Sequence, residues 1–220
     1  MKLYHYVHCP FCVRVRMALG YLNINYDSIV LPYNDEKTPV DLCEKKMLPI
    51  FSWGPDDQSN ESLDIIKRLD TDNVLKNNLL EDEEKLGEIE ELLSSIGSPT
   101  HNLAMPYWIW LPEFNVESRQ YFVEKKSQKR GPFHVLAQKR PVYLKEIEPV
   151  LKRVQAHLHP FYLGEQLSIF DIMLASHLWG LYVVPEFQFS SQMHSYLQTV
   201  KRLCQFDYLN DLWTRQNFLK

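Results

Sequence analysis

The stretch KLYHYVHCPFCVRVRMALGYL, residues 2–22, decides how the chain folds at its start. Its first part, Lys2–Val7, has the composition of a short β-strand. From residue 12 to residue 22, residues that suit the buried face of a helix recur at helical spacing: Val13, Met17, Gly20 and Tyr21. The unit Cys9-Pro10-Phe11-Cys12 therefore stands where a strand ends and a helix begins.

This corner favours thiol chemistry. A cysteine at the start of a helix lies near free backbone N–H groups and the positive end of the helix dipole, and both favour thiolate over thiol. Pro10 suits the first helical position, where its missing N–H costs nothing. We expect Cys9 to be the more exposed, attacking thiol. Cys12, one turn further, is expected to be the thiol that resolves a mixed disulfide.

Other interpretations of the cysteines are weaker. A zinc site needs a second pair of ligands at suitable spacing, and the sequence has none, so we expect no metal. His8 is expected to be a half-exposed loop residue that modulates the Cys9 thiolate. Cys43 and Cys204 are expected to be buried or incidental small residues.

The rest of the first 70 residues alternates strands and helices. Strands are expected at Tyr26–Leu31 and Ile50–Trp53, followed by a turn at residues 54–57. Helices are expected at Thr38–Lys45, where Thr38 can cap and Pro39 suits the first turn, and at Ser62–Leu69. The order β-α-β-α-β-(β)-α predicts an α/β thioredoxin-like domain at residues 1–70.

Strand signals fade after this point. Residues 71–78 are mainly polar and indicate a linker, which we place at residues 71–80. Residues 81–220 are expected to form an all-α domain, all-helical from residue 116. Amphipathic patterns predict helices at residues 81–96, 118–129 and 143–158, with Pro149 as a kink or a helix start. A nearly all-apolar segment at residues 169–178 predicts a central buried helix, which Ser168 and Asp171 begin as a capping box. The tryptophans of residues 105–112 are expected to fill the core or the domain interface.

Composition excludes several classes of protein. The chain has 220 residues and 24 Lys+Arg against 28 Asp+Glu, so its net charge of -4 gives no general field for nucleic acid. Only 7 glycines argue against a turn-rich β-sandwich. No apolar run is long enough to span a bilayer, and the first residues lack a secretory signal. We therefore expect a cytoplasmic protein with no membrane or nucleic-acid partner.

Two further motifs suggest a ligand site on the first domain. Pro49 stands just before a strand, where a cis bond could turn the Leu48 backbone toward the cysteines. Glu61 and Ser62 begin a helix, so Glu61 could hold an ammonium group while Ser62 and its N–H hold a carboxylate. A plain N-cap explains Glu61 and Ser62 equally well when they are considered alone.

Together these residues resemble glutaredoxin type 2, the large bacterial glutaredoxin with a glutathione-transferase-like fold. The resemblance is carried in the first domain by residues 1–4, 8–12, 34–36 with 38–39, 48–50 and 61–66, and in the second by residues 121–126. It is strongest from residue 1 to residue 69 and thin from residue 131 onward. The family usually has tyrosine where this chain has Phe11, which removes a hydroxyl beside the thiols and leaves dithiol chemistry intact.

The resemblance implies a glutathione-dependent thiol-disulfide oxidoreductase, with glutathione as co-substrate. By position, Cys9 matches the nucleophile and Cys12 the resolving thiol. Residues that match the glutathione contacts are Pro10, Phe11, Leu48, cis Pro49, Glu61 and Ser62. For the glycyl carboxylate of glutathione the candidates are Lys37, Lys45 and Lys46.

The resemblance also implies a monomer that acts on disulfide-containing or glutathionylated proteins. Two alternatives remain. The first is a glutathione transferase or a dehydroascorbate reductase, because Cys-Pro-Phe-Cys also occurs in dehydroascorbate-reductase-like relatives. The second is a non-catalytic interaction module of the same fold. Retention of both thiols favours the oxidoreductase.

Overall fold

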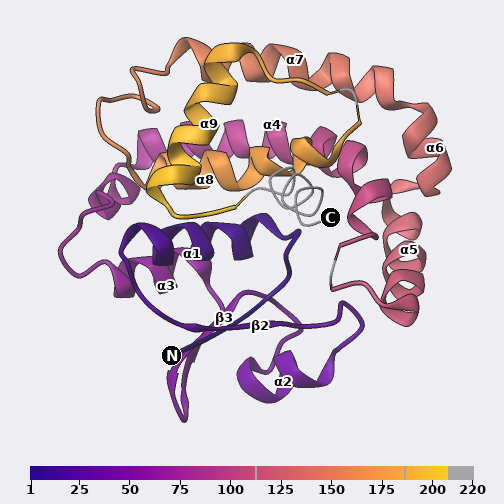
Figure 1. Cartoon of the computed structure of the whole chain (residues 1–220), viewed down its shortest axis with the longest axis horizontal. Helices are drawn as coiled ribbons and strands as arrows, with labels where there is room; N and C mark the ends of the chain where they lie inside the picture. The colour runs from indigo at the N-terminus through magenta and orange to yellow at the C-terminus, as the bar shows by residue number, and fades with distance from the viewer. Residues whose placement is uncertain (112, 186, 208–220) are drawn as a thin grey trace, which may run out of the picture.

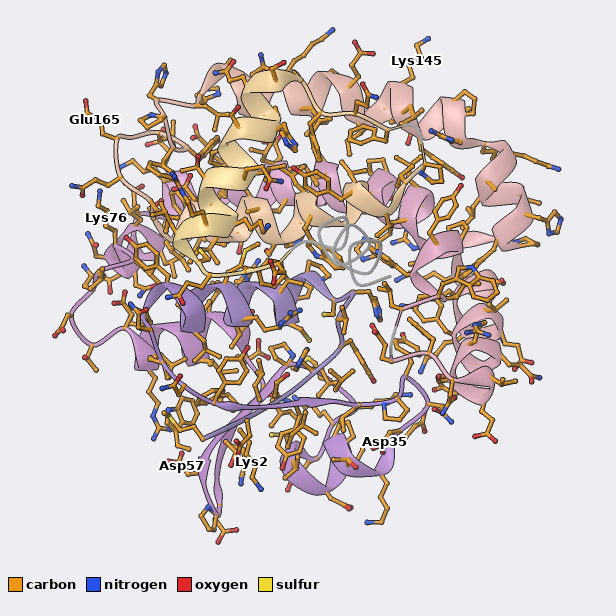
Figure 2. The ribbon with its side chains drawn as sticks, viewed as in Figure 1. Lys2, Asp35, Asp57, Lys76, Lys145 and Glu165 are labelled. Atoms are coloured by element: carbon orange, nitrogen blue, oxygen red, sulfur yellow. The ribbon has the colours of Figure 1, made fainter. Side chains whose placement is uncertain are left out.

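The structure is a computed structural model that describes residues 1–111, 113–185 and 187–207. Figure 1 shows a small sheet at one side of the molecule and a larger group of helices at the other, with α1 between them. Charged side chains such as Lys76, Lys145 and Glu165 project from the periphery (Figure 2). In the described part of the chain, no helix has both the length and the apolar character needed to cross a membrane.

The first part of the chain forms a four-stranded sheet with helices packed against it. Its strands are β1 (Lys2–His5), β2 (Asp27–Val30), β3 (Ile50–Gly54) and β4 (Asp57–Ser59), and its helices are α1 (Pro10–Tyr21), α2 (Lys37–Cys43) and α3 (Ser62–Leu69). The strand order is β2-β1-β3-β4, with β1 parallel to β2 and antiparallel to β3. The predicted α/β thioredoxin-like order is confirmed.

Two details of α2 differ from expectation. The helix begins at Lys37 rather than Thr38, and the Asp35 carboxylate accepts the Thr38 N–H at 2.9 Å. The helix ends at Cys43 because Glu44 adopts a left-handed conformation, with φ of 58°.

The second part is mainly helical, as expected. It contains α4 (Glu83–Trp108), α5 (Val116–Arg130), α6 (Phe133–Gln138), α7 (Arg140–Ala156), α8 (Ile169–Leu178) and α9 (Ser191–Leu203), with 3₁₀ turns η1 (Asn77–Glu81) and η2 (Trp179–Val183). The expectation of an all-helical region from residue 116 is wrong at residues 158–164. Residues 158–164 form two isolated β-bridges, Leu158 with Tyr162 and Phe161 with Gly164. Residue 186 and residues 208–220 of that expectation lie outside the described residues.

Several prolines lie inside helices rather than at helix ends. Helix α4 continues through Pro99 and Pro106 to Trp108, well past the expected end at residue 96. Pro149 lies inside α7 and does not begin it. The tryptophan expectation holds for Trp108, which is buried, and is wrong for Trp110, which is 63% exposed.

Helix α8 forms the centre of the second part. All its residues are buried, as its apolar sequence predicted. Ser168 and Asp171 form the predicted capping box. The Asp171 carboxylate also accepts hydrogen bonds from the Tyr162 N–H at 2.7 Å and the Tyr196 hydroxyl at 3.0 Å. This carboxylate therefore joins the start of α8 to a loop and to α9.

The two parts of the chain pack together through α1. Helix α1 contacts α3 on one side and α8 and α9 on the other. At its end, a Cβ added to Gly20 would lie 1.9 Å from the Cys204 carbonyl oxygen, so only glycine fits there. The Gln205 side chain donates to the Gly20 carbonyl at 3.1 Å.

Candidate active site

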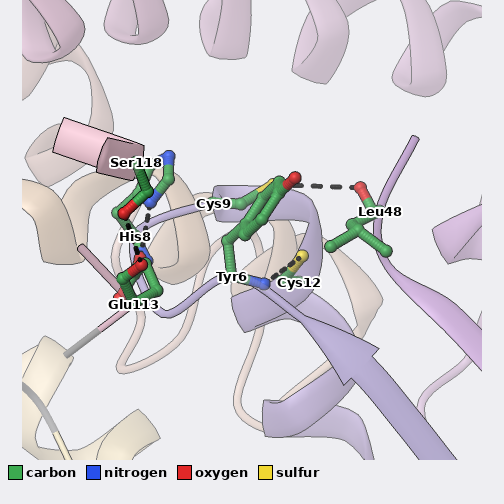
Figure 3. Close-up of polar contacts among 7 residues, drawn as sticks. All are labelled: Tyr6, His8, Cys9, Cys12, Leu48, Glu113 and Ser118. Atoms are coloured by element: carbon green, nitrogen blue, oxygen red, sulfur yellow. Dashed lines mark hydrogen bonds and ion pairs between the residues drawn. The ribbon is translucent and has the colours of Figure 1, made fainter. Parts of the chain in front are cut away.

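Cys9 is the N-cap residue of α1. Its backbone is extended, with φ of −75° and ψ of 122°, and Pro10 follows as the first helical residue. The side chain is half-buried, and its Sγ lies 4.0 Å from the Leu48 carbonyl oxygen (Figure 3). The sulfur therefore stands at the start of a helix, where anions are stabilised.

Cys12 lies one turn further and is fully buried. Its Sγ accepts the Tyr6 N–H at 3.4 Å. Burial and the neighbouring Cys9 sulfur raise the pKa of Cys12 well above 9.0. The expected difference in exposure between the two thiols is thus present in the structure.

The pKa of the Cys9 thiol is lowered instead of raised. A hydrogen bond from Cys12 lowers the pKa of Cys9 from 9.0 to about 6, against the raising effect of burial. His8 and the backbone N–H groups of Cys12 and Phe11 lower it further. The dithiol can therefore supply one thiolate that attacks and one protonated thiol held in reserve.

The Leu48–Pro49 peptide bond is cis, as the family resemblance implied. Strand β3 begins at Ile50 and runs antiparallel to β1, with Tyr4 opposite Ile50. The loop before β3 and the loop after β1 therefore meet at the same end of these two strands. This arrangement places the Leu48 backbone beside Cys9.

A cleft of about 510 Å³ lies between the first part of the chain and the helices of the second. Its lining residues come from α1, α3, α4 and α8 and include Phe11, Glu61, Ser62, Glu90 and His177. Phe11 is 47% exposed and meets the His177 ring edge-on, with 5.6 Å between the centroids. Cys9 and Leu48 do not line this cleft. Phe11, which lines the cleft, stands between Cys9 and Cys12 in the sequence.

Arg14 is a cleft residue that sequence reasoning did not select. It is 3% exposed, and its Nη1 donates to the Ser62 Oγ at 3.3 Å. Its guanidinium lies 5.1 Å from the Phe11 ring centroid, and its Nε has no partner among the described residues. Burial lowers the pKa of Arg14 to about 10, so it stays cationic at neutral pH. A buried cation beside a helix N-terminus suits a carboxylate.

Two of the three lysine candidates have protein partners. Lys37 pairs with Asp41 on the exposed face of α2. Lys46 pairs with Glu36 at 3.0 Å and donates to the Tyr121 hydroxyl at 2.9 Å. None of the three lysines lines the cleft.

The expectation for His8 is wrong, because the residue is buried and not half-exposed. Its partner is Glu113, which lies between α4 and α5 and which no sequence pattern singled out. Cys204 is buried as expected, whereas Cys43 is half-buried. No group of three His, Cys, Asp or Glu residues in the described ranges could hold a metal ion.

Family comparisons agree with this architecture. Residues 3–76 match the glutathione S-transferase N-terminal domain, and residues 88–212, more than half of the chain, match the glutaredoxin 2 C-terminal domain. The chain belongs to the glutaredoxin 2 family. This membership makes it a glutathione-dependent oxidoreductase with a glutathione-transferase-like fold.

Individual relatives of this glutaredoxin 2 family member span nearly its whole length. Glutaredoxin 2 of Escherichia coli K12 is 29% identical over 216 residues, which cover 96% of this chain and 99% of the relative. The crystal structure of glutaredoxin 2 from Salmonella typhimurium in complex with glutathione is also 29% identical. It superimposes with a TM-score of 0.83 over 96% of this chain and 97% of that one.

The fold extends beyond the glutaredoxin 2 family. Glutathione transferase GSTFuA3 from Phanerochaete chrysosporium superimposes with a TM-score of 0.76 at 17% identity, covering 94% of this chain and 97% of that one. At this identity the likeness concerns the fold alone.

Proposed function

We propose that this glutaredoxin reduces disulfides and glutathione mixed disulfides through Cys9 and Cys12. The observation that carries the proposal is the unequal pair of thiols. Cys9 is a half-buried sulfur at a helix N-terminus, and Cys12 is a fully buried thiol that donates to it. Such a pair separates attack from resolution.

The reaction balances in two exchanges. The Cys9 thiolate attacks one sulfur of the substrate disulfide, forms a mixed disulfide and expels the other sulfur as a thiolate. Cys12 then loses its proton and attacks the Cys9 sulfur, which releases the second substrate thiol and leaves a Cys9–Cys12 disulfide. Two glutathione molecules reduce that disulfide and become glutathione disulfide. With a glutathionylated substrate, a second glutathione can replace Cys12 in the release step.

Glutathione is proposed to bind along the edge that runs from Cys9 to α3. The Leu48 backbone beside cis Pro49 would pair with the cysteinyl part, with Pro10 and Phe11 beside it. Support comes from the 4.0 Å approach of the Cys9 sulfur to the Leu48 carbonyl and from the relative crystallised with glutathione.

The cleft is proposed to take the γ-glutamyl end. Ser62, the first N–H groups of α3 and Arg14 would hold its carboxylate, and Glu61 would hold its ammonium group. The hydrogen bond between Arg14 and Ser62 supports this assignment, since it brings a cation and a hydroxyl to one helix N-terminus.

An assay with two substrates tests the function against its alternatives. We expect glutathione-coupled reduction of a mixed disulfide, and loss of that activity in Cys9→Ser. Conjugation of an electrophilic acceptor or reduction of dehydroascorbate at a higher kcat/KM would favour the transferase or dehydroascorbate reductase. Lack of glutathione binding would favour the non-catalytic interaction module.

The remaining proposals concern the setting of the reaction. We propose a monomer that acts on disulfide-containing or glutathionylated proteins in the cytoplasm, where glutathione is kept reduced. We also propose domains at residues 1–70 and 81–220 with a linker at residues 71–80. In support, α3 ends at Leu69 and α4 begins at Glu83. Sedimentation analysis tests the monomer, and limited proteolysis within residues 71–80 tests the linker.

A further inference from the structure

A buried hydrogen-bonded contact between a carboxylate and an imidazole joins the helical part of the chain to the residue before Cys9. The Glu113 Oε1 accepts two hydrogen bonds from His8, one from the ring Nδ1 at 2.6 Å and one from the backbone N–H at 3.1 Å. The Glu113 side chain is 0% exposed and that of His8 is 8% exposed. Figure 3 shows His8 and Glu113 together, with Cys9 nearby.

Stability alone is a weak reason for this pair. Taking a carboxylate out of water costs free energy, and apolar residues of similar size often serve the fold as well. The other oxygen of Glu113, Oε2, finds no hydrogen-bond partner among the described residues. Both bonds made by the carboxylate end on one residue, His8, and the next residue along the chain is Cys9.

The surroundings leave the His8 ring little freedom. Aromatic rings from several elements pack around it at centroid distances of 5.2–5.7 Å: Tyr6, Tyr33, Trp108, Phe114 and Phe122. With the ring enclosed and the backbone N–H fixed by Glu113, the position of residue 8 is determined. The extended Cys9 N-cap follows it directly.

We propose that Glu113 is a positioning residue that holds His8 and thereby sets the reactivity of Cys9. The inference rests on the proposed function, in which Cys9 is the nucleophile. It gives the helical part of the chain a role in the thiol chemistry, because Glu113 is supplied from the loop between α4 and α5.

His8 acts on Cys9 electrostatically, because its protonated ring would lower the pKa of the Cys9 thiol. Loss of the carboxylate that holds His8 should therefore raise the Cys9 pKa. The direct field of the Glu113 anion works the other way, because removing an anion makes a nearby thiol easier to ionise. The sign of the change consequently distinguishes action through His8 from direct action.

Other ionisable groups also face this corner. Those that interact with Cys9, His8 or Glu113 come from the elements packed around them: His5, Tyr6, Cys12, Arg14, Arg16, Tyr33, His101 and Lys126. None of them is changed in Glu113→Gln, which keeps the size and shape of the side chain. The matched control is Glu117→Gln, the same substitution at an exposed residue on the first turn of α5.

The experiment is alkylation of the reduced full chain by iodoacetamide from pH 5 to pH 9, with mass spectrometry reporting modification at Cys9. For Glu113→Gln we expect the midpoint of the rate profile to move to higher pH. At pH 5.5 the rate should fall by about threefold to tenfold, since below the pKa the thiolate fraction changes tenfold per unit. The profile of Glu117→Gln should match that of the unaltered chain.

Two variants of His8 complete the test. His8→Gln should show the same upward shift, and Glu113→Gln added to His8→Gln should move the profile no further. A downward shift in Glu113→Gln, or an unmoved profile with a lower melting temperature, overturns the inference. If Glu113→Gln does not fold, an unmoved profile in His8→Gln overturns it instead. Reductase activity retained by Cys9→Ser would refute the proposed function, which is a separate result.

Discussion

Replacing Arg14 by methionine is expected to weaken glutathione binding while leaving the fold intact. Arg14 is 3% exposed, and its Nη1 lies 3.3 Å from the Ser62 Oγ at the start of α3. A hydrogen bond between a charged donor and a carboxylate contributes about 1.5–3 kcal/mol. At about 1.4 kcal/mol per factor of ten, glutathione should bind about tenfold to 150-fold more weakly.

The fold should tolerate this change because the guanidinium is desolvated, as its pKa of about 10 indicates. Replacing a buried charged side chain by an apolar one of similar length often leaves the stability of the fold unchanged or raises it. The melting temperature of Arg14→Met should therefore hold or rise. A matched control is Arg16→Met, two positions along the same helix, whose guanidinium lies over the Phe206 ring and outside the cleft.

Calorimetric titration with S-methylglutathione measures the affinity without disulfide formation at Cys9. A second titration uses the analogue in which the γ-glutamyl carboxylate is an amide. Arg14→Met should weaken binding of the first ligand strongly and binding of the second hardly at all. Equal losses for both ligands, or no loss for either, would refute the assignment of the carboxylate to Arg14.

Four more predictions concern single residues. Cys12→Ser should keep the reduction of glutathionylated substrates and lose most reduction of protein disulfides in coupled assays, whereas Cys9→Ser should lose both. In the unaltered chain, the alkylation rate of Cys9 should rise with pH around 6 and not around 9.0, because the lowered pKa makes thiolate available; a midpoint above pH 8 would contradict this. Glu61→Gln should weaken glutathione by about 1.5–3 kcal/mol in calorimetry with an unchanged melting temperature, and a lower melting temperature alone would mean that Glu61 only caps α3. Asp171→Asn should lower the free energy of unfolding by about 1–3 kcal/mol for each hydrogen bond left unmade, measured by urea denaturation; unchanged stability would show that the buried carboxylate is dispensable.

Local sequence signals predicted the first part of the chain well. The strand–cysteine–helix corner and the turn after β3 depend on residues within a few positions of one another. A helix N-terminus, and a proline at the first helical position, act through their immediate neighbours, so their effects can be predicted without knowing the fold. The capping box of Ser168 and Asp171 was predictable for the same reason. The cis bond at Pro49 was implied by the family resemblance, because a proline alone leaves both cis and trans open.

Contacts between distant segments could not be predicted in this way. Arg14 and Arg16 are basic residues two positions apart on α1, and only the packing of α3 and α8 determines which of them enters the cleft. His8 and Glu113 are separated by 105 positions, and neither belongs to a motif that would indicate the other. Helix α4 continues through two prolines because packing against its neighbours outweighs the local preference of proline for a helix end.

The close approach of Gly20 to the Cys204 carbonyl also bears on which substrates the enzyme can accept. With no room there for even a methyl group, α1 and the end of α9 are in direct backbone contact, and α1 carries the reactive corner at its other end. We expect the enzyme to present a preformed surface that does not open by sliding α1 away from the helices. A protein disulfide would then have to be delivered on a protruding loop or a locally unfolded segment. Selection among client proteins would thus follow the accessibility of their disulfides more than the sequence around them.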